Sequence, residues 1–322
     1  MARPKKPTIP SRPHLAKPPR NILELDRFSE ANLRQWQSAS ENLDELEDVL
    51  YFNLEPERRK HRPQLLSALQ AIAPLEREIT NWGRLIDYQY SDEPLSCAGS
   101  LCSPEGGGRF NVGIELDAGT ISPWSALYIA QDHETAFREK FQMESNGNVD
   151  GLTGPELALK PGINFTYISL TGKLFNVFDL RTDTAVKNLA QILGKIAMPA
   201  RARVLAKELK IPAAELFMVR SAQQVRDMAL KNNWRTLPVQ FGLPSQSHIL
   251  AELIRAAGFE AILYKSTKGP GDCLAIFPDR MADLSFIEIA GNIPSTVKHK
   301  RLDSNSARDL EGWEWTPRKF HP

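Results

Sequence analysis

The stretch Ser125–Glu139, SALYIAQDHETAFRE, contains both kinds of element from which the fold is built. Its first six residues are typical of a β-strand, and alternation places Tyr128 between two alanines on one face. Asp132 is a favourable helix N-cap, and the residues after it predict a helix that carries Glu139 off its apolar stripe. A strand that leads directly into a helix indicates a fold that contains both.

The same mixture of short strands and helices continues from Trp82 to Ala290 and predicts an α+β fold with helical insertions. A turn at Thr171–Gly172–Lys173 is expected to separate two strands. Further strands are expected at residues 165–170, 174–180, 261–266 and 273–277, and further helices at residues 185–196, 204–209, 222–230 and 245–257.

The regions outside this mixed segment have their own composition. Residues 1–22 form a basic, proline-rich arm that serves either as an electrostatic tether or as a solvated tail. Residues 23–82 show helical periodicity at 29–50 and again at 65–82, which predicts an N-terminal helical hairpin. The hairpin either binds a partner or another copy, or covers one side of the domain at residues 83–290. Residues 291–322 are expected to be a polar tail.

Charge and composition exclude several classes of protein. Forty basic residues stand against 39 acidic residues, so the net charge of +1 gives no field that attracts nucleic acid. No apolar stretch reaches the length of a membrane span, and the first residues lack a secretory signal core. Three cysteines and six dispersed histidines give neither a disulfide framework nor a metal-ligand spacing. We expect a cytoplasmic protein with no metal, no membrane contact and no nucleic-acid partner.

One loop has residue types that suit an anion. In Gly106–Arg109 the missing side chains let backbone amides approach a phosphate, and the arginine can bind it with two hydrogen bonds. A glycine run before an arginine is more often a plain turn. No serine-hydrolase elbow and no dinucleotide-binding fingerprint is found in the sequence.

The order of several segments resembles the RES domain, the toxin half of bacterial toxin and antitoxin pairs. The segments are GGGRFN at 106–111, SALYIA at 125–130, DHETAFRE at 132–139, GFEAILYKS at 258–266 and CLAIF at 273–277. The resemblance extends over residues 84–278 and implies a mixed sheet similar to ADP-ribosyltransferase toxins, with NAD as the substrate. It also implies an antitoxin or immunity protein as partner. No cofactor is expected, and self-association is left open.

The resemblance assigns roles to individual positions. Arg109, Tyr128, Glu139 and Ser266 fall on the family's arginine, tyrosine, glutamate and serine, and Arg84 is a weaker match to an earlier arginine. This sequence also departs from the family pattern. It has Glu260–Ala261 for an aspartate–glycine pair, Lys265 for a proline and Cys273 for an asparagine.

The chemistry of NAD cleavage suits these residue types. Loss of nicotinamide leaves positive charge on the ribose, which Glu139 would stabilise, and the neutral leaving group needs no paired acid. Arg109 and Gly108 would bind the pyrophosphate, Tyr128 would face nicotinamide, and Ser266 would bind ribose or the carboxamide. If inorganic phosphate is the acceptor instead of water, a second cation is needed, for which the candidates are Arg84, Lys265 and Lys268.

Three functions are compatible with these residues. The chain is an NAD phosphorylase or NAD glycohydrolase, an ADP-ribosyltransferase, or a non-catalytic interaction protein on the same scaffold. A transferase would have a further acid or amide two residues before the glutamate, and that position here is Phe137. Retention of all four family residues argues against the non-catalytic alternative.

Overall fold

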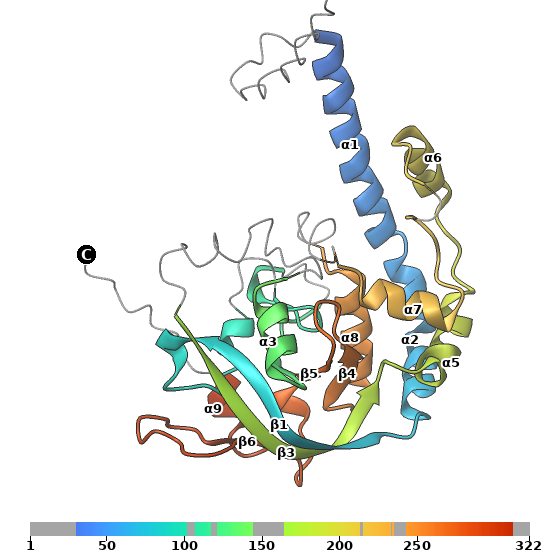
Figure 1. Cartoon of the computed structure of the whole chain (residues 1–322). Helices are drawn as coiled ribbons and strands as arrows, with labels where there is room; N and C mark the ends of the chain where they lie inside the picture. The colour runs from blue at the N-terminus through green and yellow to red at the C-terminus, as the bar shows by residue number, and fades with distance from the viewer. Residues whose placement is uncertain are drawn as a thin grey trace, which may run out of the picture.

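Two long strands, β1 (Leu75–Asp87) and β3 (Phe165–Asp179), pair antiparallel along most of their length and form the lower part of the molecule in Figure 1. The computed structural model describes residues 30–101, 107–116, 121–143, 164–212, 215–232, 234 and 243–311. Within this part of the chain, seven strands form one mixed sheet in the order β1-β2-β5-β4-β3-β6-β7. The shorter strands are β2 (Leu127–Ala130), β4 (Ala261–Lys265), β5 (Asp272–Ile276), β6 (Phe286–Ile289) and β7 (Arg301–Asp303). The α+β class is confirmed.

The sheet closes on itself because β1 pairs with β3 and also with β2, where Gly83 lies opposite Ala130. β2 pairs with β5, β5 with β4, and β4 runs parallel to β3, so that five strands complete a ring. β6 pairs with the other edge of β3, and β7 pairs with β6.

Side chains of β2 alternate between the two faces of the sheet, as the sequence predicts. Ala130 and the partly buried Tyr128 belong to a core cluster that includes residues from the helices, whereas Leu127 and Ile129 belong to a second cluster that includes Leu302 of β7. Each buried leucine or isoleucine contributes about 1.5–3 kcal/mol, so both faces stabilise the fold.

Most of the predicted helices are confirmed. The described helices are α1 (Glu30–Phe52), α2 (Glu55–Gln70), α3 (His133–Lys140), α5 (Asp183–Leu193), α6 (Ala200–Glu208), α7 (Ala222–Ala229), α8 (Gln246–Ala256) and α9 (Ala307–Glu311). Asp132 caps α3 as expected, because its side chain accepts a hydrogen bond from the Thr135 amide. The helical residues expected between positions 182 and 232 form α5, α6 and α7.

The prediction of an N-terminal helical hairpin at residues 23–82 is wrong. Residues 75–82 belong to β1, and α2 begins at Glu55, ten residues before the second expected helix. Pro56 lies in the first turn of α2, where proline is tolerated, while Pro63 lies inside the helix. Figure 1 shows α2 following α1 almost end to end, and α1 packs against α6. The expected boundary between residues 82 and 83 therefore falls inside a strand, and residues 1–22 lie outside the described residues.

The prediction of a turn at Thr171–Gly172–Lys173 is also wrong, because β3 continues through these three residues. Gly172 pairs with Ile287 of β6. A Cβ atom on Gly172 would lie 2.1 Å from the carbonyl oxygen of Phe286. This glycine allows two backbones to approach closely and does not mark a turn.

The C-terminal polar tail begins later than expected. β7 extends the sheet, and Leu302, Ala307 and Leu310 are buried in the second core cluster. Residues 291–311 are thus part of the fold, while residues 312–322 lie outside the described residues.

None of the helices in the described ranges combines the length and the apolar character needed to cross a membrane.

Candidate functional site

Glu139 and Ser266 meet although 127 residues separate them in the sequence. The Ser266 hydroxyl donates a hydrogen bond of 2.6 Å to Glu139 Oε1. The Ser266 hydroxyl oxygen in turn accepts hydrogen bonds from the amides of Lys268, at 3.0 Å, and Gly269, at 2.8 Å. Because the two amides occupy the acceptor positions of the hydroxyl, its proton is directed to the carboxylate. The pair therefore holds the Glu139 carboxylate in a fixed orientation.

The loop after Ser266 is fastened to the helix that carries Glu139. The Thr135 hydroxyl accepts a hydrogen bond of 2.9 Å from the Gly271 amide, and Thr135 lies one turn before Glu139. A Cβ atom on Gly269 would lie 2.7 Å from Thr135 Cα. The glycines of the sequence TKGPGD thus allow the loop to lie directly on α3, which places Ser266 beside Glu139.

Tyr128 lies beside residues 107–111, which we call the glycine loop. Its hydroxyl donates to Asn111 Oδ1 and accepts from the Phe110 amide, both at 2.9 Å. Asn111 Oδ1 also accepts a hydrogen bond of 2.9 Å from the Gly108 amide, and Asn111 is fully buried. A Cβ atom on Gly108 would lie 2.4 Å from the Tyr128 hydroxyl oxygen. Only glycine fits here, so that the loop and the tyrosine form one hydrogen-bonded unit.

Arg109 is almost completely buried, and its guanidinium group donates hydrogen bonds to backbone carbonyl oxygens. Nη1 donates to the carbonyl oxygens of Lys231, at 2.8 Å, and Ala229, at 3.3 Å, at the end of α7. Helix C-termini carry partial negative charge, which suits a guanidinium group. Nη2 donates to the Thr267 hydroxyl at 3.4 Å, and the guanidinium carbon lies 5.8 Å from the centre of the Trp234 ring. Arg109 thereby reaches the residue next to Ser266.

Two neutral side chains complete the same face of the sheet. Tyr264 and Cys273 lie opposite each other on β4 and β5. Burial raises the pKa of the Tyr264 phenol, and the nearby Cys273 and Glu139 add to the shift. Burial likewise raises the pKa of the Cys273 thiol, with Glu139 as the second cause. Cys273, which replaces the family's asparagine, therefore presents an uncharged thiol next to Glu139.

The structure does not bring Arg84 to this face. Its Nη1 donates to the carbonyl oxygens of Pro94, at 2.7 Å, and Ser96, at 3.0 Å. Burial lowers the pKa of this guanidinium. Residues on either side of these carbonyls, such as Cys97, belong to the second core cluster, on the opposite face from Tyr128 and Tyr264. The expected substrate-binding role of Arg84 is corrected to a structural one.

The two lysines beside Ser266 differ in their surroundings. Lys265 is exposed, and its Nζ lies 3.6 Å from the carboxylate of Asp272. Lys268 is half-buried in the loop whose amides bind Ser266. Lys268 is thus the better placed of the two to meet a ligand at the Glu139 pair.

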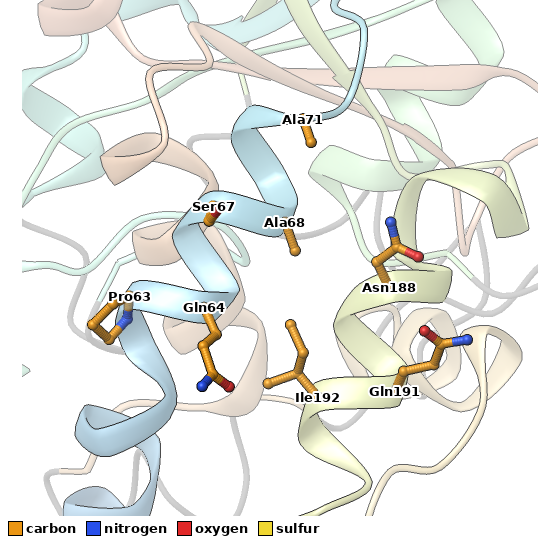
Figure 2. A pocket seen from close by; sticks show the side chains of 8 residues that line it. All are labelled: Pro63, Gln64, Ser67, Ala68, Ala71, Asn188, Gln191 and Ile192. Carbon is orange, nitrogen blue, oxygen red and sulfur yellow. The ribbon is translucent and has the colours of Figure 1, made fainter.

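A separate hollow lies between α2 and α5 (Figure 2). Small, apolar and amide side chains line it: Pro63, Gln64, Ser67, Ala68, Ala71, Asn188, Gln191 and Ile192. None of these side chains titrates near neutral pH, and none belongs to the predicted site. The hollow therefore lacks the groups that NAD cleavage requires.

Across the ranges that the structure describes, no group of three or more histidine, cysteine, aspartate or glutamate side chains is arranged to hold a metal ion. Cys97 and Cys273 are buried free thiols, while Cys102 and Gly106 lie outside the described residues.

Sequence reasoning did not single out several residues of the site. Asn111 and Tyr264 lie inside the quoted segments GGGRFN and AILYKS, so a signal was present. Thr267, Trp234 and His248 contact the glycine loop across distant parts of the chain, and no local pattern predicts these contacts.

Comparison with known proteins leaves the family open. No protein-family model matches the chain, and no curated protein matches it. One solved structure is similar, the crystal structure of the M. tuberculosis MbcT–MbcA toxin–antitoxin complex, with 12% sequence identity and a TM-score of 0.37. The similar region covers 77% of this chain and 96% of that chain.

Proposed function

We propose that this chain is a RES-type enzyme that breaks the bond between nicotinamide and ribose in NAD. The observation that carries the proposal is the direct contact between Glu139 and Ser266 over 2.6 Å. Arg109 reaches Thr267, the neighbour of Ser266, and Tyr128 lies on the same face of the sheet. These contacts support a common site for the four residues that the resemblance assigns.

Glu139 supplies the negative charge that the reaction needs. When the bond between the ribose C1 and the nicotinamide nitrogen breaks, the bonding electrons neutralise the pyridinium ring and leave a cation on the ribose. A carboxylate that is already oriented stabilises this cation without reorganisation. Ser266 holds that orientation, and the neutral Tyr264 and Cys273 beside it add no competing charge.

The glycine loop and Arg109 supply the pyrophosphate site. Carbonyl oxygens at the end of α7 hold Nη1 of Arg109 and the Thr267 hydroxyl holds Nη2, so the guanidinium is fixed beside the loop that would receive the pyrophosphate and would offset its negative charge. The missing side chain of Gly108 makes room for Tyr128, and its amide donates to Asn111, so this glycine fixes the loop that carries Arg109. Tyr128, whose hydroxyl is held by Asn111 and the Phe110 amide, offers its ring face to nicotinamide.

Phosphate is the acceptor that we infer. It attacks the ribose cation through one oxygen, and the products are nicotinamide and a phosphorylated ADP-ribose. Because Arg109 serves the pyrophosphate and Arg84 lies on the opposite face, the second cation is Lys268. Transfer to a macromolecule is disfavoured, since Phe137, two residues before Glu139, packs against Phe141 with ring centres 4.7 Å apart.

This activity would deplete cytoplasmic NAD and stop growth. We accordingly propose an ADP-ribosyltransferase-like core, a toxin role, and an antitoxin or immunity protein that restrains the enzyme.

The test is nicotinamide release from NAD by the purified chain, compared with a Glu139→Ala variant. Turnover should fall at least about a hundredfold in a variant that stays folded, because Glu139 stabilises charge that develops only during the reaction. The proposal fails if the wild-type chain releases no nicotinamide, or if the variant releases it at the wild-type rate.

A further inference from the structure

His248, at the start of α8, lies beneath the glycine loop and is fully buried. The Ser245 amide donates a hydrogen bond of 3.2 Å to His248 Nδ1. Nδ1 is therefore the acceptor, and the ring proton is on Nε2. Nε2 lies 2.8 Å from the carbonyl oxygen of Gly108 and donates to it. The hydrogen bonds of the helix cap thus select the tautomer that can bind the loop.

The same ring also contacts the side chain that supports Arg109. The rings of His248 and Trp234 meet edge to face, with centres 5.2 Å apart. The guanidinium of Arg109 lies over the Trp234 ring. The buried imidazole of His248 therefore supports the backbone before Arg109 through the Gly108 carbonyl. It also supports the guanidinium of Arg109 through the Trp234 ring.

We propose that His248 is a positioning residue for NAD binding, an inference that rests on the proposed function. It fixes the peptide between Gly108 and Arg109, because a planar peptide whose carbonyl is held cannot rotate. With both ring nitrogens bonded and no exposed surface, His248 itself touches no substrate. Its loss should therefore weaken binding of the pyrophosphate and leave the chemical step at Glu139 intact.

Two variants separate this role from helix capping. In His248→Asn the amide oxygen takes the place of Nδ1, so the cap is retained while the donor to Gly108 is lost. In His248→Gln the side-chain amide nitrogen reaches the position of Nε2, so the donor to Gly108 is kept. The matched control is Ser245→Ala, which removes the hydroxyl that accepts from the His248 amide at 3.3 Å and leaves the contact with Gly108 in place.

The experiment measures kcat and KM for NAD and the melting temperature of each variant. Loss of one hydrogen bond is equivalent to about a fivefold to tenfold change in affinity. We expect KM to rise by about that factor in His248→Asn with kcat within about twofold, and to stay within about twofold of wild type in His248→Gln. Ser245→Ala should lower the melting temperature without changing KM.

An unchanged KM in folded His248→Asn, or the same rise in His248→Gln, would overturn the positioning role. If His248→Asn does not fold, Trp234→Leu tests the same support for Arg109 without touching the cap. It should raise KM with little change in kcat, and wild-type KM in that variant would also overturn the role. A wild-type chain without any NAD turnover refutes the proposed function instead, so the two failures are distinguishable.

Discussion

Replacing Ser266 with alanine removes the hydrogen bond that orients Glu139. A hydrogen bond to a charged group contributes about 1.5–3 kcal/mol. If this contribution is realised in full when the ribose cation forms, kcat falls by about 10- to 150-fold, since each 1.36 kcal/mol is a factor of ten. KM should change little, because the pyrophosphate is held by Arg109. The substitution also leaves the Lys268 and Gly269 amides without their acceptor, so stability should fall as well.

The chain contains a matched control for this loss of stability. Ser285 donates a hydrogen bond of 2.8 Å to the buried carboxylate of Glu260 and accepts one from the Phe175 amide. Ser285→Ala should therefore lower the free energy of unfolding by about 1–3 kcal/mol and leave kcat unchanged. Steady-state kinetics and urea unfolding of both variants form the assay. Equal kcat in wild type and a folded Ser266→Ala variant would refute the role of the serine.

Further predictions concern ligand binding by Arg109, the pH dependence of stability and the N-terminal arm. Arg109→Ala should weaken the binding of ADP-ribose at least about tenfold by calorimetry, because a charged hydrogen-bond donor is lost. Burial raises the pKa of Cys97 from 9.0 to about 12, so the contribution of this thiol to the free energy of unfolding should be constant below about pH 9 and be lost toward pH 12. The unfolded thiol ionises in that range first, and Cys97→Ala should flatten the decline in urea titrations. Deletion of residues 1–20 should leave kcat and KM for NAD unchanged.

The sequence predicts elements well where one face of a regular element meets the core. The helix at residues 245–257 follows a clear 3.6-residue period and is α8, with Ser245 as its cap. The sequence of β1 predicts a helix wrongly, because the strand is bulged. Its register shifts between Leu75 and Arg77 and again between Ile79 and Trp82. The bulges space Leu75, Ile79 and Trp82 four and three residues apart, as in a helix.

Around the candidate site, the sequence predicts the local elements but not the contacts between them. The segments that contain Tyr128 and Glu139 are adjacent in the sequence. The sequence predicts both the strand that carries Tyr128 and the Asp132 cap of the helix that carries Glu139. Arg84 bonds to carbonyl oxygens on the face opposite Tyr128, and no local pattern in the sequence shows which face of its strand meets the candidate site. His248 was missed because it reaches Gly108 across 140 residues. Such contacts follow from the closure of the sheet and not from any local pattern.

The most direct test of the central claim is the identification of the product formed from NAD with and without inorganic phosphate, by mass spectrometry or phosphorus NMR. We predict nicotinamide together with a phosphorylated ADP-ribose, faster NAD loss when phosphate is present, and a smaller phosphate stimulation in Lys268→Ala. Equal rates that give only free ADP-ribose would replace the phosphorylase with a glycohydrolase. ADP-ribose attached to a protein or nucleic acid, or NAD left intact, would contradict the account.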